Sequence, residues 1–142
     1  MSDEGLNFKK ALTYAFLLLK YRGRARKEMI QRLERKEYEP QTVSLVLAYL
    51  EDKNYINDRE FVVSYAQSAK EKKWGPRKIK FYLAKLGLKG QIVEEELKDK
   101  ASQIKDIKIL IDRKKRSLTN KKNIYQKIMR HLVSRGFEYE GL

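Results

Sequence analysis

Cysteine is absent from this 142-residue chain, and histidine occurs only once, at position 131. The lack of cysteine excludes disulfide bridges, thiol nucleophiles and cysteine-ligated zinc sites. A single histidine also argues against a histidine-rich metal cluster and against a Ser-His-Asp triad. We therefore expect a protein that is not an enzyme and that uses no metal or cofactor.

Long hydrophobic runs are missing as well. The longest apolar run, Ala15 to Leu19, is far shorter than the roughly 20 residues that a membrane-spanning helix needs. The amino terminus carries Asp3 and Glu4 and lacks the basic and apolar order of a signal peptide. These features predict a cytoplasmic protein that does not associate with a membrane.

Proline and glycine are scarce, with two and seven residues, and apolar residues recur at intervals of three and four. This periodicity is typical of amphipathic helices, whereas strands alternate with a period of two. The sequence therefore predicts an all-helical protein. The expected apolar stripes are Leu12, Ala15, Phe16 and Leu19; Met29, Ile30 and Leu33; Val43, Val46, Leu47 and Leu50; Phe61, Val62, Tyr65 and Ala66; Ile79, Leu83 and Leu86; Ile92, Val93 and Leu97; Ile107, Leu110 and Ile111; and Ile128 and Leu132.

The helices follow a repeat. The segments Lys36-Glu37-Tyr38, Leu86-Gly87-Leu88 and Arg135-Gly136-Phe137 each close a helix, and they are separated by 50 and then 49 residues. A period near 50 is typical of repeat proteins, in which each unit buries a small core against its neighbours. We expect tandem three-helix units that resemble helix-turn-helix modules and form an elongated, curved molecule.

The predicted units are 1–56, 57–101 and 102–142. In the third unit the last helix should begin near Tyr139, but the chain ends at Leu142. We therefore expect eight helices, with the third unit lacking its last one. The boundary between the second and third units contains neither glycine nor proline, and it is either a kink or a continuous long helix.

Two short segments predict helix ends. Gly75 and the proline after it should open a middle helix as cap and first residue, and Gly87 should close that helix in the left-handed conformation. We expect the same of Gly136 in the third unit. Asn57 or Asp58 should cap the helix that carries Phe61, because their side chains accept hydrogen bonds from free helix N–H groups. This reading of Asp58 is more economical than a hydrolase with paired carboxylates.

Positive charge is in excess, with 33 Lys and Arg against 19 Asp and Glu, and it grows toward the carboxyl end. Basic and acidic residues number 11 and 8 in 1–56, 11 and 7 in 57–101, and 11 and 4 in 102–142. The window 113–135 holds nine basic residues and no acidic one. Any single lysine can serve solubility alone, but the ensemble predicts a surface that follows nucleic-acid phosphates.

The candidate binding residues are all basic, and six of the thirteen lie in the window 113–135. Because lysine is the commonest residue among them and suits phosphates better than base edges, we expect binding to single- and double-stranded DNA without sequence specificity. Trp74 either stacks on an unpaired base or packs against a neighbouring helix, and packing is favoured. The candidates are Arg22, Arg24, Arg26, Lys72, Lys73, Arg77, Lys78, Arg113, Lys114, Lys121, Lys122, Lys127 and Arg130.

Several motifs resemble the RecX family of recombinase regulators. They are the run Tyr55-Ile56-Asn57-Asp58-Arg59-Glu60-Phe61, the run Trp74-Gly75-Pro76-Arg77-Lys78-Ile79, and Leu83 with Leu86-Gly87-Leu88. The resemblance covers about residues 10–138. In one departure, the family usually has Ser where this chain has Ala25, three residues before Glu28. The helix that follows should lose a side-chain acceptor at a cost of about 0.5 to 2 kcal/mol.

The resemblance implies a monomeric protein of DNA repair, recombination and the SOS response that binds RecA and RecA–DNA filaments. It also implies that such a protein modulates RecA, most often by inhibiting its ATPase, strand-exchange and coprotease activities. The alternative, which rests on charge alone, is a general DNA-binding architectural or transcription-regulatory protein with helix-turn-helix-like repeats.

Overall fold

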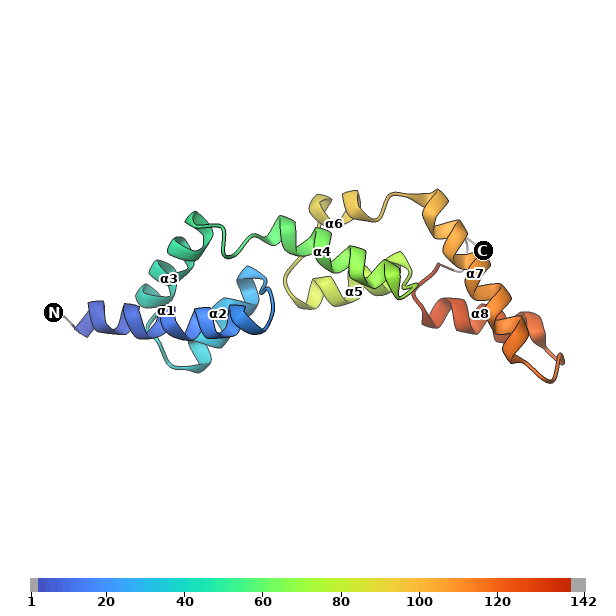
Figure 1. Ribbon diagram of the computed structural model, residues 1–142, viewed down its shortest axis with the longest axis horizontal. Helices are drawn as coiled ribbons and strands as arrows, with labels where there is room; N and C mark the ends of the chain where they lie inside the picture. The colour runs from blue at the N-terminus through green and yellow to red at the C-terminus, as the bar shows by residue number, and fades with distance from the viewer. Residues whose placement is uncertain (1–2, 139–142) are drawn as a thin grey trace. The chain divides into compact units, whose positions relative to one another are not determined.

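The computed structural model describes residues 3–138, which form eight helices and no strand (Figure 1). This confirms the prediction of an all-helical fold. The last helix expected near Tyr139 would lie outside the described residues. The helices are α1 (Asp3–Tyr21), α2 (Arg26–Arg35), α3 (Pro40–Asp52), α4 (Asp58–Glu71), α5 (Pro76–Lys85), α6 (Gln91–Glu96), α7 (Lys100–Ser117) and α8 (Ile124–Ser134).

The chain divides into two compact units, residues 1–61 and residues 62–142, with the division inside α4. We call them unit 1 and unit 2 and describe each by itself. Division into three repeats, at the boundaries expected from the sequence, stays a prediction.

Unit 1 is built from α1, α2 and α3, with α3 packed against both of the other helices. The predicted apolar stripes supply its core: Met29 and Leu33 from α2 are fully buried, and so are Val46 and Leu50 from α3. The stripe of α1 is shifted, because Ala11, Ala15 and Leu18 are buried while Leu12, Phe16 and Leu19 cover the edge of the core. Small residues on α1 allow its backbone to approach α3 closely.

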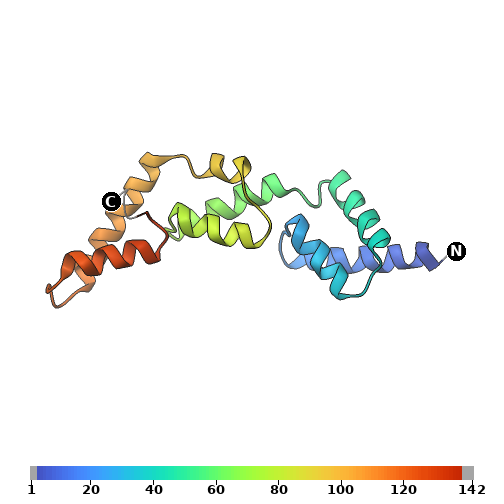
Figure 2. The ribbon, with the colours of Figure 1, turned by 180° about the vertical axis from the view of Figure 1, so that it is seen from behind.

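Unit 2 ends in a hairpin of α7 and α8, which lie side by side in Figures 1 and 2. Leu110 of α7 packs with Ile128, Leu132 and Phe137. The helical conformation is interrupted between α6, which ends at Glu96, and α7, which begins at Lys100. The side chain of Asp99 caps α7 by accepting a hydrogen bond of 3.1 Å from the backbone N–H of Ser102. The sequence predicted either a kink or a continuous long helix at this boundary. Both alternatives are wrong, because α7 is a separate helix with its own cap.

The ends of the repeated middle helices share one backbone conformation. Glu37, Gly87 and Gly136 have φ values of 65°, 80° and 99°. In each case the residue that follows donates its N–H to the carbonyl of the aligned leucine, as Leu88 does to Leu83 at 2.9 Å. This left-handed ending satisfies carbonyls at the end of the helix, and it occurs at all three positions that the sequence aligns at offsets of 50 and 49.

Within unit 2 the start of α5 is joined to the turn after α8. The N–H of Gly75 donates to the carbonyl of Arg135 at 2.7 Å, and the N–H of Arg77 donates to the carbonyl of Gly136 at 2.9 Å. A Cβ on Gly75 would lie 2.5 Å from the carbonyl oxygen of Gly136, so the backbone at Gly136 leaves no room for a side chain at position 75. Free N–H groups at the start of α5 thus pair with carbonyls beyond α8.

Candidate nucleic-acid interface

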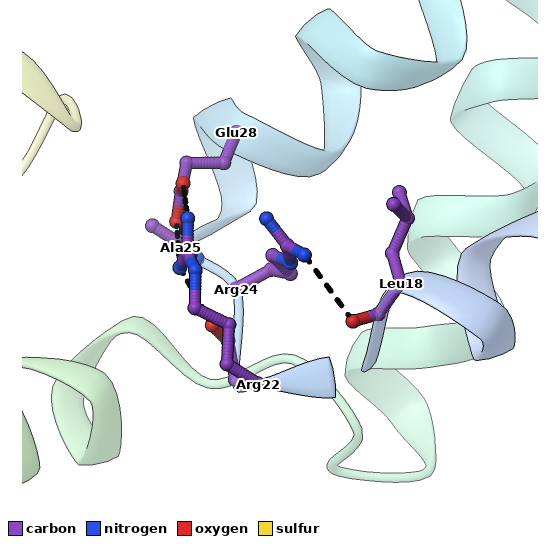
Figure 3. A network of polar contacts seen from close by, with 6 residues as sticks. Leu18, Arg22, Arg24, Ala25 and Glu28 are labelled. Atoms are coloured by element: carbon purple, nitrogen blue, oxygen red, sulfur yellow. Dashed lines mark hydrogen bonds and ion pairs between the residues drawn. The ribbon is translucent and has the colours of Figure 1, made fainter. Parts of the chain in front are cut away.

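Arg22, at the end of α1, is held by an ion pair with Glu28 of α2. Its guanidinium donates to both carboxylate oxygens, at 2.5 and 3.1 Å, and Figure 3 shows the two side chains turned toward each other. Burial pushes the pKa of Glu28 upward, but the bonds from Arg22 and from the N–H of Ala25 outweigh it and hold that pKa below its usual range. The positive charge of Arg22 is therefore already paired with a carboxylate of unit 1.

Arg24 is half-buried and points inward. Its guanidinium donates to the carbonyl of Leu18 at 3.4 Å, near the end of α1 (Figure 3), while its Nε is buried without a partner among the described residues. Burial and then the neighbouring charge of Arg22 lower the pKa of Arg24, although a guanidinium stays charged at neutral pH. Its geometry suits the carbonyls at the end of α1 better than an external phosphate.

Arg26 opens α2 and makes two contacts within unit 1. Its Nε lies 3.0 Å from Glu51, and its backbone N–H donates to the carboxylate of Asp58 at 2.8 Å. Asp58 thus serves α2, whereas Asn57 caps α4 by accepting from the N–H of Glu60 at 3.1 Å. Of the two candidates, Asn57 and not Asp58 therefore caps α4.

In unit 2, Lys72 and Lys73 differ in whether a carboxylate of the protein already pairs with the ammonium group. Lys73 has a φ of 61° at the end of α4, and its ammonium lies 3.7 Å from Asp106 of α7. Lys72 is exposed, its ammonium lies 5.8 Å from the Trp74 ring centroid, and its carbonyl accepts from the Arg135 guanidinium. Arg77 is exposed on the first turn of α5. Lys72 and Arg77 are therefore better placed for an external anion than Lys73.

Aromatic residues lie just before α5 and on it, beside lysines of the same segment. The ring of Trp74 lies 5.4 Å from that of Tyr82, and Tyr82 lies 5.2 Å from Phe81. The ammonium of Lys78 sits 4.4 Å from the Trp74 centroid. Trp74 therefore contacts Tyr82 of α5, the helix that it precedes, and its packing against a neighbouring helix stays a prediction. Sequence reasoning missed Phe81 and Tyr82, although helical spacing from Ile79 could have placed Phe81 on the outer face.

The α7–α8 hairpin carries six of the thirteen candidate cations. Lys121 donates to the carbonyl of Lys115 at 2.5 Å, at the end of α7. No hydrogen bond or ion pair joins the side chains of the other candidates here to another described residue. These candidates are Arg113, Lys122 and Arg130, which are exposed, and Lys114 and Lys127, which are half-buried.

His131 is half-buried beside this group. Burial, followed by the charges of Lys114 and Arg135, lowers its pKa from the usual value. Near neutral pH His131 is therefore an uncharged residue within a cationic surface. A phosphate placed there would raise its pKa by offsetting the neighbouring charges.

An open groove of about 500 Å³ lies elsewhere in unit 2, between α5, α6 and α7. Its lining carries both Lys80, Lys98 and Lys100 and the carboxylates of Glu94, Glu95 and Glu138. Mixed charge makes this groove a poorer site for a polyanion than the hairpin. Across residues 3–138, no group of three or more potential metal ligands gathers, and no helix is long and apolar enough to cross a membrane.

Two family models match the chain in tandem. The model described as the first three-helix domain of RecX matches residues 11–50, and that of the second three-helix domain matches residues 57–97. The chain belongs to the RecX family. The two RecX matches cover all of α2, α4, α5 and α6 and most of α1 and α3, so they confirm tandem three-helix domains in this part of the chain.

Relatives agree with the RecX assignment. Regulatory protein RecX of Listeria innocua is 33% identical over 140 residues, which are 93% of this chain and 51% of the relative. Regulatory protein RecX of Clostridium beijerinckii is 29% identical over 144 residues, 96% of this chain and 67% of the relative. The chain thus spans about half the length of the Listeria relative. The crystal structure of RecX from Lactobacillus salivarius matches with a TM-score of 0.85 at 26% identity, covering 96% of this chain and 92% of that one.

Proposed function

We propose that this chain regulates RecA by binding RecA and RecA–DNA filaments, and that its main effect is to inhibit RecA's ATPase, strand-exchange and coprotease activities. The observation that carries the proposal is the tandem match to both RecX three-helix domains, over residues 11–50 and 57–97. Regulation of this kind needs no catalytic group. The protein acts by binding, as a monomer in the cytoplasm.

The charge distribution supports a DNA contact within such a complex. Exposed side chains of Arg113, Lys122 and Arg130 make no ion pair among the described residues, so binding a phosphate would not first break an internal pair. Released counterions would then favour binding to a polyanion of any sequence. The contact extends to single- and double-stranded DNA. Among the thirteen candidates, Arg22, Arg24, Arg26 and Lys73 contribute least, because protein groups already engage them.

Selectivity for filaments separates this function from general DNA binding. The labelled protein is titrated with RecA filaments on single-stranded DNA in a non-hydrolysable nucleotide, and with the same DNA lacking RecA. We expect filaments to bind at least about tenfold more tightly, equivalent to about 1.4 kcal/mol. Equal affinity for both would contradict the proposal and favour the DNA-binding alternative, an architectural or transcription-regulatory protein.

A further inference from the structure

The outer face of α5 carries aromatic residues that the core does not use. Ile79 and Leu83 are buried and fix the inner face of the helix. At 100° per residue, Phe81 is roughly 200° around the helix from Ile79, on the opposite side. Phe81 is 56% exposed and Tyr82 38% exposed. Burial in unit 2 therefore does not account for these two rings.

The rings of Trp74, Tyr82 and Phe81 form a continuous group, which we call the aromatic row. Tyr82 stands between the other two, with centroid distances of 5.4 Å to Trp74 and 5.2 Å to Phe81. Trp74 is tilted by 35° against Tyr82, while Phe81 meets Tyr82 edge to face at 84°. Three neighbouring rings thus present faces and edges over one stretch of surface.

Lysine ammonium groups line the aromatic row. Lys78 lies 4.4 Å from the centroid of Trp74, and Lys85 lies 4.5 Å from that of Phe81 and 5.4 Å from that of Tyr82. Lys72 also lies 5.8 Å from the centroid of Trp74. None of these three lysines forms an ion pair with another described residue. Because the stems are flexible, the ammonium groups can move from the ring faces to an anion.

A single-stranded nucleic acid offers both chemistries that this surface needs. Its phosphates pair with lysines, and its unpaired bases present π-faces to aromatic rings. A duplex hides those faces in its own stack, and an acidic peptide would match the lysines without needing three adjacent rings. We propose that the aromatic row, with Lys72, Lys78 and Lys85, stacks unpaired bases of single-stranded nucleic acid. This inference rests on the proposed function, because it assigns a ligand and residues to the DNA contact of that regulator.

Trp74 provides the readout, because it is the only tryptophan in the chain. The 142-residue chain is titrated with an oligothymidine strand and with an abasic strand of the same length, which has the same phosphates and no bases. We expect oligothymidine to quench Trp74 fluorescence and to bind at least about fivefold more tightly than the abasic strand, which corresponds to one stacked base. The abasic strand should bind through charge and leave the fluorescence nearly unchanged.

Variants test whether the aromatic row carries this preference. Phe81→Ala and Tyr82→Ala alter exposed side chains, so circular dichroism should match that of the parent protein. Each should reduce the preference for oligothymidine by about fivefold while affinity for the abasic strand is unchanged. Tyr21→Ala is the matched control, because Tyr21 is 79% exposed and belongs to unit 1, whereas the aromatic row belongs to unit 2. It should retain the full preference.

Three results would overturn the inference. Equal binding of both strands would mean that bases are not stacked, while the basic surface of the proposed function would stand. If polyglutamate displaced the bound strand as effectively as additional oligothymidine does, the aromatic row would be assigned to an acidic protein partner. Failure to bind either strand would count against the DNA contact itself, and selective binding to RecA filaments would then still support the regulatory function.

Discussion

At the scale of single residues, Asp58 compensates for the missing capping side chain of α2. Ala25 precedes that helix and has no side-chain acceptor, although Glu28 still accepts a bond from its N–H at 3.1 Å. Asp58, 32 residues further along the chain, accepts from the N–H of Arg26. A carboxylate at a helix start also interacts favourably with the helix dipole. The residue that looked like a cap for its own helix therefore stabilises another one.

Asp58→Ala should destabilise unit 1 by about 0.5 to 2 kcal/mol, because a free N–H at the start of α2 loses its acceptor. The measurement is urea unfolding followed by circular dichroism. Asp52→Ala is the matched control, since Asp52 is exposed and should change stability by less than about 0.5 kcal/mol. Equal stability changes in Asp58→Ala and Asp52→Ala would show that Asp58 does not stabilise the start of α2.

Glu37→Gly should raise the stability of unit 1 by about 0.5 to 1 kcal/mol, because Glu37 is exposed at a φ of 65°. In the same unfolding assay, Gly87→Ala should lower stability by about 1 kcal/mol, since Gly87 holds the aligned position at a φ of 80°. A loss of stability in Glu37→Gly would mean that the glutamate side chain stabilises this turn in a way that its backbone does not reveal.

At the scale of elements, the contact between the start of α5 and the turn after α8 organises unit 2. Two backbone hydrogen bonds, from Gly75 and Arg77, cross between segments that lie about 60 residues apart in the sequence. They satisfy N–H groups that a helix start cannot pair internally. Glycine at position 75 is required by this close approach and not by its own φ, which is −83°.

Gly75→Ala should destabilise unit 2 by about 1 to 3 kcal/mol, because the added methyl group would overlap the backbone of Gly136 and Phe137. Thermal unfolding and hydrogen exchange of the α5 and α8 amides would measure the effect. Gly23→Ala provides the control, since a Cβ there meets no atom within 4 Å. If both variants behaved alike, the close packing of α5 against the turn after α8 would be refuted.

Local features of the sequence predicted the helices and their ends well. The stripes of α2, α3 and α8, the left-handed Gly87 and Gly136, and the start of α5 at Pro76 all depend on residues close in sequence. The contact of Gly75 with Gly136 depends on which elements pack together, and a single sequence does not reveal this.

The candidate site was less predictable, for the same reason. The stretch of arginines before α2 looks cationic in sequence, but Arg22 and Arg26 are paired with Glu28 and Glu51 across different helices. Lys73 is likewise paired with Asp106 of α7. Only the fold separates such engaged charges from free ones. The helical period did contain the signal for Phe81, which shares α5 with the buried Ile79.

At the scale of the whole molecule, 33 basic residues stand against 19 acidic ones, an excess that favours interaction with a polyanion. The distribution of this charge should matter more than its total, because internal ion pairs neutralise part of it within each unit. The free cations of the α7–α8 hairpin should therefore contribute more to DNA binding than equally charged residues elsewhere.

Lys121→Glu combined with Lys122→Glu should weaken DNA binding and lower the salt slope of log K by about 1 to 2, while circular dichroism is unchanged. Lys9→Glu combined with Lys10→Glu makes the same change in net charge on exposed residues of α1, in unit 1. This control pair should retain most of the affinity. Equal losses in both pairs would mean that net charge alone, and not the hairpin, determines binding.

The proposed function requires that this RecX-family chain acts on RecA itself. The decisive measurement is RecA's ATPase on single-stranded DNA while the protein is titrated to well below one molecule per RecA. An unrelated protein of similar positive charge is the control. We predict inhibition at this sparse stoichiometry by the RecX-family chain and none by the control protein. Inhibition only when the chain saturates the DNA would contradict the account, because it would mean simple competition for phosphates.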